Sequence, residues 1–148
     1  MKFLALFSLL FVLSCSSKKL DQNYISEKNI IYYQPNSDSK LALDLYRKKS
    51  NEKLPVILIV HGGGWTKRTR ADMDDIAMEA AKRGYVAVNV SYRLAPQHQF
   101  PEQVKDLRAA LRWIHTHAEK YNMDTSRIAG WGYSAGAHLV SLLGLAQD

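Results

Sequence analysis

Blocks of apolar residues along the chain predict strands that alternate with helices. A continuous apolar run at residues 56–60 is typical of a strand buried on both faces of a parallel sheet, and the mainly apolar segments 85–92 and 127–133 predict two further strands. Two earlier segments, 29–33 and 41–47, predict a pair of strands ahead of them, because the second alternates apolar with polar positions. The predicted sheet therefore contains strands buried on both faces and a strand exposed on one face.

The segments between the later strands have the apolar periodicity of helices. Residues 71–83 place apolar side chains on one face, and Gly84 predicts the end of that helix. Pro101 opens a second helix, where its missing N–H costs nothing. Residues 135–146 predict a third helix directly after the last strand, and residues 122–126 read as a turn. This order predicts an α/β fold, a mostly parallel sheet with flanking helices.

Composition and charge narrow the function classes. The chain has 148 residues, 47% of them hydrophobic and 23% charged, which suits one globular domain rather than a disordered chain. The formal net charge is +6, but the basic residues are scattered apart from short clusters at 47–49 and 67–70. Without a basic stripe or a recognisable module, we expect no nucleic-acid partner. A solvated basic surface explains the charge.

The N-terminus predicts export. Lys2 is followed by an apolar run at residues 3–13, interrupted by Ser8 alone, which has the length of a signal-peptide core and is too short to span a bilayer. Residues 1–14 are therefore predicted to be a signal peptide of the lipoprotein type, and residues 15–28 a polar tether. The domain proper is expected over residues 29–148.

Cys15 is the single cysteine of the sequence, so the chain forms no internal disulfide and no thiolate zinc cluster. The segment VLSCSS resembles a bacterial lipobox, with Val12 and Leu13 departing from the preferred residues. The resemblance implies lipidation of Cys15, a membrane anchor, and, from Ser16, delivery to the outer membrane. The alternative is an ordinary cleaved signal peptide with an incidental cysteine.

GYSAG at residues 132–136 matches the pattern G-x-S-x-G. In that pattern the serine sits on a tight strand-to-helix turn, and glycines on both sides of it remove collisions across the turn. The predicted strand 127–133 and the helix that follows supply the required context. Ser134 is therefore a candidate nucleophile, with Gly132 and Gly136 as supporting residues.

HGGGW at residues 61–65 directly follows the buried run 56–60. Glycines let backbone amides approach a substrate, and preset amides stabilise the negative oxygen that forms during ester hydrolysis. A plain glycine-rich turn and a phosphate loop are alternatives. The sequence has neither the Gly-Lys-Ser/Thr of a Walker loop nor the glycine spacing of a dinucleotide fingerprint.

HGGGW, SYRLAP, FPEQVKDLRAALRWI and RIAGWGYSAGAHL together resemble α/β-hydrolase fold esterases, most closely the hormone-sensitive-lipase-like carboxylesterases and the related acetyl-esterase group. The resemblance covers about residues 29–148. It implies Ser134 as the nucleophile, an oxyanion hole formed by the amides of Gly63, Gly64 and Ala135, and His61 as a brace for the loop. No cofactor or metal is implied. Gln97 and Gln99 depart from the lipase-like branch.

The resemblance also implies a substrate pocket lined by Trp65 and Tyr133, although core packing explains a single aromatic equally well. The expected substrates are small acyl esters. In this fold an acid and then a histidine follow the serine by many residues. After His138 the sequence has no histidine, and its one acidic residue is the terminal Asp148, which is not expected to serve. His138 itself lies one helical turn beyond Ser134, along the helix, and is not expected to be the base.

These residues predict a serine carboxylic-ester hydrolase that is incomplete as the 148-residue chain and inactive alone. We expect a truncated reading frame or a fragment of a longer protein. Strand 127–133 would then form an exposed apolar edge that invites aggregation. The alternatives are a non-catalytic lipid-anchored remnant, and a formamidase or serine peptidase of the same fold.

Overall fold

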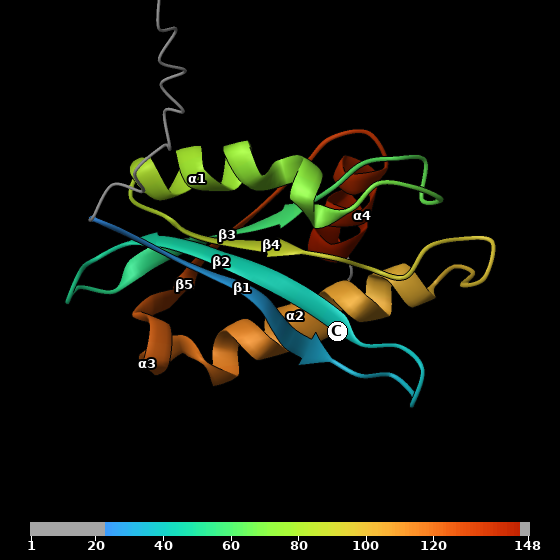
Figure 1. Cartoon of the computed structure of the whole chain (residues 1–148), viewed down its shortest axis with the longest axis horizontal. Helices are drawn as coiled ribbons and strands as arrows, with labels where there is room; N and C mark the ends of the chain where they lie inside the picture. Colours follow the sequence, from blue (N-terminus) through green and yellow to red (C-terminus); the bar gives the residue numbers. More distant parts are fainter. Residues whose placement is uncertain (1–22, 146–148) are drawn as a thin grey trace, which may run out of the picture.

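The computed structural model describes residues 23–145. The predicted signal peptide, Cys15 and most of the predicted tether lie outside the described residues. Within them, five strands form one sheet with helices on both faces (Figure 1). The α/β class predicted from the sequence is therefore confirmed.

The sheet has the order β1-β2-β4-β3-β5. Its strands are β1 (Tyr24–Tyr33), β2 (Leu41–Lys48), β3 (Leu54–Val60), β4 (Val86–Val90) and β5 (Met123–Gly132). The first two strands are antiparallel to each other, and β2 is antiparallel to β4. β3 lies parallel between β4 and β5, so the carboxyl ends of these three strands meet at one edge.

The helices cover the sheet from two sides. They are the 3₁₀ turn η1 (Arg70–Met73), α1 (Asp74–Lys82), α2 (Glu102–Thr116), α3 (Ala118–Tyr121) and α4 (Ala135–Leu145). Figure 1 shows α1 on one face and α2 with α3 on the other. α4 contacts α2 and packs on β5.

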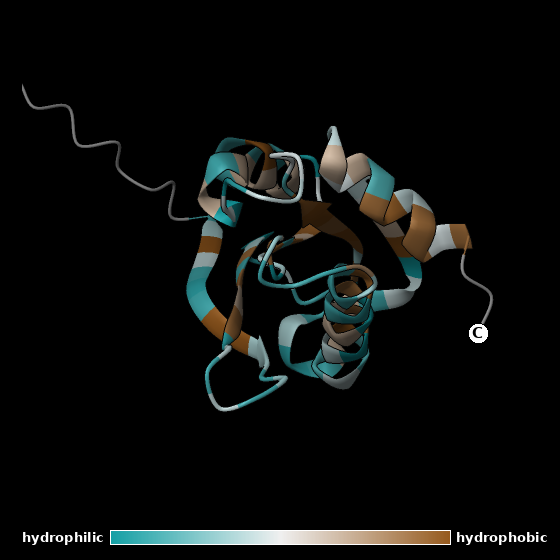
Figure 2. Cartoon of the chain, turned by 90° about the vertical axis from the view of Figure 1, so that its right-hand side faces the viewer, coloured by the Kyte–Doolittle hydropathy of each residue, from teal (hydrophilic) through white to brown (hydrophobic). Residues whose placement is uncertain are grey.

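Side-chain alternation along the central strands explains the two layers of core. On β3, Val56 and Leu58 join the larger cluster under α2 and α4, while Ile59 joins the smaller cluster under α1. Ala87 of β4 faces α1, where the helix contributes alanines as well, so the two elements pack closely. In Figure 2 α4, which leads to the C-terminal label, carries hydrophobic colour along much of its length.

Three boundaries differ from the sequence prediction. β1 begins at Tyr24 rather than at residue 29, because its polar first half still pairs with β2, Tyr24 opposite Lys48. The predicted tether therefore ends earlier than residue 28. Residues 122–126, predicted as a turn, lie mostly within β5, where Asp124 pairs with Pro55 before the ladder shifts register. α3 was not predicted from the sequence.

Helix signals explain the remaining boundaries. The predicted helix 71–83 begins as η1 and continues as α1, and Gly84 follows its end at a φ of 91°.

No described helix has the length and apolar content that crossing a membrane requires. Residues 23–145 also contain no group of three or more metal-ligating side chains placed to hold an ion.

Candidate active site

Ser134 lies on the sharp turn between β5 and α4. Its φ is 53°, a left-handed conformation that serine adopts only at an energetic cost of about 1–2 kcal/mol. The residue is exposed, and α4 begins at the next position, Ala135. The turn therefore presents the hydroxyl to solvent, with the positive end of a helix beside it.

Strand register brings the glycine loop alongside this turn. In the parallel β3–β5 ladder, Val60 pairs with Gly132. Both strands end at that pair, so Gly62 on one chain segment and Ser134 on the other each follow it by two residues. Adjacent parallel strands are about 4.8 Å apart, and the two segments therefore leave the sheet as neighbours.

Close backbone approach at the glycines confirms that the segments touch. A Cβ on Gly136 would lie 2.1 Å from the Val60 carbonyl oxygen and 2.7 Å from that of His61. A Cβ on Gly62 would lie 2.9 Å from the Tyr133 carbonyl oxygen. A Cβ on Gly132 would overlap Gly136, its carbonyl carbon being 2.5 Å away. Larger residues would push the loop and the turn apart.

Two glycines of the loop adopt positive φ angles. Gly63 and Gly64 have φ values of 113° and 60°, which glycine adopts readily. The Gly63 carbonyl accepts bonds from the amides of Thr66 and Lys67, each at 3.2 Å. Within residues 23–145, the amides of Gly63, Gly64 and Ala135 donate to no other residue. These are the three groups predicted to form the oxyanion hole.

His61 lies beneath the loop rather than at its surface. Its ring is buried, stacks on Tyr92 with centroids 4.3 Å apart, and places Nδ1 2.8 Å from the Gly62 carbonyl oxygen. The Tyr92 hydroxyl in turn donates to the His61 carbonyl at 3.0 Å. Burial lowers the pKa of His61, so the ring is neutral at pH 7. This position suits a brace.

Buried polar contacts fix the far end of the loop. The Arg70 Nε atom lies 3.0 Å from Asp44, whose side chain is almost fully buried. Asn89, at 0% exposure, donates to the Arg70 carbonyl at 2.8 Å. The loop is therefore held at both ends, by β3 before it and by these contacts where η1 begins.

Trp65 and the residues after Ser134 border an apolar pocket. The Trp65 ring meets His138 edge-on, with centroids 5.4 Å apart. The pocket has a volume of about 340 Å³ and is lined by Trp65, Ala95, Phe100, Gln103, His138 and Leu139. Tyr133, the other predicted lining residue, is not among them. Its ring packs beside Gly62 and under the Arg68 guanidinium instead.

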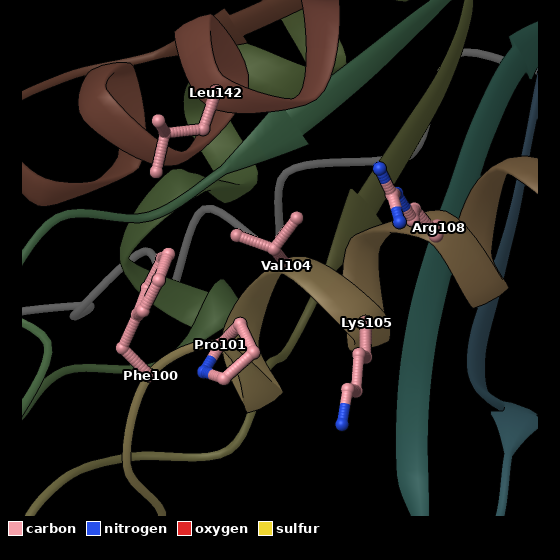
Figure 3. Close-up of a pocket in the computed structure, with 6 residues that line it drawn as sticks. All are labelled: Phe100, Pro101, Val104, Lys105, Arg108 and Leu142. Atoms are coloured by element: carbon pink, nitrogen blue, oxygen red, sulfur yellow. The ribbon is translucent and has the colours of Figure 1, made fainter. Parts of the chain in front are cut away.

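A second hollow of about 270 Å³ lies further along α2 and α4 and shares Phe100 with the first. Figure 3 shows Phe100, Val104 and Leu142 around this space, with Lys105 directed away from it. None of its lining residues belongs to the glycine loop or the serine turn. We therefore assign the predicted chemistry to the first pocket.

The five histidines of the sequence all lie in the described region, and none bonds to the Ser134 hydroxyl there. His61 is under the loop, His98 pairs with Glu102 at 2.8 Å, and His117 stacks on Trp113. His115 is exposed on α2, and the His138 ring is directed to Trp65. That His138 is not the base stays a prediction.

Sequence reasoning missed three residues around the site: Arg68, Phe100 and the pocket role of His138. His138 follows Ser134 by one helical turn, so helical spacing already places it near the serine turn. Phe100 comes from the loop before α2, and no periodicity relates that loop to α4. The position of Arg68 depends on the path of the glycine loop.

The family model BD-FAE matches residues 43–148. Esterase LipC of Mycobacterium tuberculosis is 32% identical over 130 residues, which cover 86% of this chain and 32% of LipC. Carboxylesterase NlhH of the same species is 39% identical over 99 residues, which cover 66% of this chain and 31% of NlhH. The chain thus spans about a third of the length of these relatives.

Solved structures give the same result for the fold. A bacterial heroin esterase superimposes with a TM-score of 0.73 at 32% identity, over 87% of this chain and 41% of that one. Esterase B from Lactobacillus rhamnosis, solved with a phosphonate inhibitor, gives a TM-score of 0.75 at 28% identity, over 86% of this chain and 41% of that one. The chain therefore belongs to the BD-FAE family and has the α/β-hydrolase fold of the carboxylesterases that it resembles.

Proposed function

We propose that this chain carries the nucleophile and oxyanion hole of a serine carboxylesterase. The Ser134 oxygen attacks the carbonyl carbon of an ester, and the carbonyl oxygen gains a negative charge held by the amides of Gly63, Gly64 and Ala135. The alcohol leaves with a proton, giving an acyl-serine. Water then hydrolyses the acyl-serine and restores the hydroxyl.

One observation carries this proposal above the others: an exposed serine in a left-handed turn packs against the glycine loop, with Gly62 against Tyr133 and Gly136 against Val60 and His61. Backbone strain of this kind is concentrated at functional sites, so it favours a functional role for Ser134. The esterase relatives agree with this chemistry.

The proposed substrates are esters with small acyl groups. The pocket beside Trp65 is mostly apolar and about 340 Å³ in volume, and it closes against α4 one turn after Ser134. Apolar walls suit an acyl chain or a simple alcohol.

We further propose that the 148-residue chain lacks a general base for Ser134, since all of its histidines are placed elsewhere. Turnover of p-nitrophenyl acetate should then be no faster than that of Ser134→Ala. Turnover that depends on Ser134 would contradict this and show that the chain supplies a base.

Nucleophile and oxyanion hole can be tested without turnover. Phenylboronic acid adds to a serine oxygen and becomes tetrahedral, so boron NMR should show a tetrahedral signal with the chain. The signal should be lost in Ser134→Ala and kept in Ser141→Ala, since Ser141 lies on α4 and donates to the Ala137 carbonyl. A tetrahedral signal that survives in Ser134→Ala, or the absence of this signal from the unmodified chain, would favour the alternative of a non-catalytic remnant.

We also propose that the protein is exported and anchored by lipid on Cys15. The basic start, the apolar run 3–13 and the following Cys15 support this. Labelled palmitate should be incorporated when the full chain is expressed in a bacterium, and Cys15→Ala should abolish the label while Ser17→Ala keeps it. Equal labelling of all three proteins would rule out the anchor.

A further inference from the structure

A guanidinium lies over the ring of Tyr133, the residue before Ser134, and we propose that Arg68 makes this site select esters that carry a carboxylate close to the ester bond. The inference rests on the serine chemistry proposed above, because it concerns what the same site binds. Arg68 lies on the loop between the three glycines and η1, and 48% of its side chain is exposed.

The side chain of Arg68 lies between both halves of the site. Its Cζ atom is 5.8 Å from the centre of the Tyr133 ring, and Tyr133 directly precedes Ser134. Its Cβ atom lies 3.1 Å from the position that a Cβ on Gly63 would occupy. An arginine over an aromatic ring is held by cation–π attraction. The guanidinium thus lies beside the residue before the nucleophile, and the Cβ from which the side chain extends lies beside Gly63, a predicted amide donor.

The backbone at Arg68 does not favour an arginine. Its φ of 75° is left-handed, a conformation that glycine adopts without cost and that arginine adopts rarely. Residues held in such conformations are concentrated at binding and catalytic sites. Because the side chain is half exposed, it adds little to the core. The charge is what this residue supplies.

That charge is only weakly neutralised by the protein. The Arg68 Nη1 atom is 3.8 Å from an Asp72 oxygen, and both side chains are exposed. By contrast, an Arg93 nitrogen lies 2.7 Å from the buried Asp106. A ligand carboxylate can therefore interact with Arg68 without breaking a close ion pair.

Two residues of the loop would bind different parts of such an ester. Trp65 contacts His138 and borders the apolar pocket, whereas Arg68 contacts Tyr133. An ester with an apolar group and a carboxylate would use both contacts. A neutral ester would use the pocket alone.

Equilibrium binding tests this preference without turnover. Affinities of the full chain for meta-carboxyphenylboronic acid and for its neutral match, meta-carbamoylphenylboronic acid, would be measured from tryptophan fluorescence. We expect the carboxylate probe to bind about fivefold more tightly, the size expected of a partly exposed ion pair. Salt at about 0.5 M should reduce that ratio.

Arg68→Gln should bring the ratio of the two affinities close to one, and Arg68→Lys should restore part of it. The control is Arg83→Gln, which removes the same charge from the exposed end of α1, where Arg83 pairs with Glu79. That control should keep the ratio of the unmodified chain. A ratio unchanged in Arg68→Gln, or lost equally in Arg83→Gln, would overturn the role of Arg68.

Ser134→Ala separates this inference from the proposed function. If both boronic acids bind Ser134→Ala as they bind the unmodified chain, the serine chemistry itself is wrong. If binding depends on Ser134 but the ratio does not depend on Arg68, the serine chemistry stands and the carboxylate preference is wrong.

Discussion

At the scale of single residues, some glycines near Ser134 occupy positions where a side chain would collide with the backbone. Gly136 and Gly144, which lie on the same helix, differ in this respect. A Cβ on Gly136 would collide with two carbonyl oxygens of β3 and the glycine loop, whereas a Cβ on Gly144 would meet nothing within 4 Å. The same substitution should therefore have opposite effects at the two positions.

Gly136→Ala should lower the free energy of unfolding by about 2–3 kcal/mol, because α4 has to move away from β3. Gly144→Ala should raise it by up to about 1 kcal/mol, because alanine favours the helix. Urea unfolding followed by circular dichroism measures both. Equal stability of the two variants would show that α4 does not rest on the end of β3 as described.

At the scale of elements, the loop after β4 is fixed to α2 by one buried ion pair. Arg93 Nε lies 3.0 Å from both oxygens of Asp106, and the Arg93 amide donates to the same carboxylate at 2.9 Å. Asp106 is fully buried. This loop also carries Phe100, so the pair helps to shape the proposed substrate pocket.

Asp106→Ala should lower the free energy of unfolding by about 3 kcal/mol, because it removes the buried partner of Arg93 and leaves only the partly exposed Glu102, 3.0 Å from Arg93 Nη1, to balance the charge. The double variant Asp106→Leu with Arg93→Met should be more stable than Asp106→Ala, since neither charge remains. Glu79→Gln, which removes an exposed partner on α1, should change stability by less than about 0.5 kcal/mol. A double variant less stable than the single one would contradict this account.

The same elements show what the sequence can and cannot predict. Val56 to Val60 were predicted because a continuous apolar run is typical of a strand buried on both faces, and the helix stripes because burial along a helix follows a fixed period. β1 was predicted too short, because its first residues are polar and are ordered by pairing with β2. The roles of Ser134, Gly63 and Gly64 stay predictions. Arg68 could not be placed, since left-handed backbone in a loop has no periodic signal.

At the scale of the whole molecule, one side of the sheet is open. Among residues 23–145, β5 pairs only with β3, and Ala129 and Gly130 are exposed along it. A shallow apolar hollow of about 170 Å³ runs between β5 and α4, lined in part by Ile128, Val140 and Leu143. An unpaired apolar edge of this kind is a template for pairing with other chains.

The 148-residue chain should therefore self-associate as its concentration rises. Ala129→Lys should reduce the association, because charge on an edge strand opposes pairing. Gln97→Lys adds the same charge to an exposed loop and should leave the association unchanged. Sedimentation velocity over a concentration series measures all three proteins, and a chain that stays monomeric throughout would refute the prediction.

Because of the irregularity in the β3–β5 ladder, the length of the chain that enters β5 can change without moving the proposed site. Pro55 pairs with Asp124 and Val56 with Ile128, so residues 125–127 have no partner in the ladder. Extra residues inserted there would enlarge a surface bulge and leave the pairing from Ile128 to Gly132 intact. A deletion beyond Ile128 would instead shift every later pair and carry Ser134 out of step with Gly62. Evolution can thus vary the segment that enters β5 freely, while the segment that leaves it admits almost no change in length.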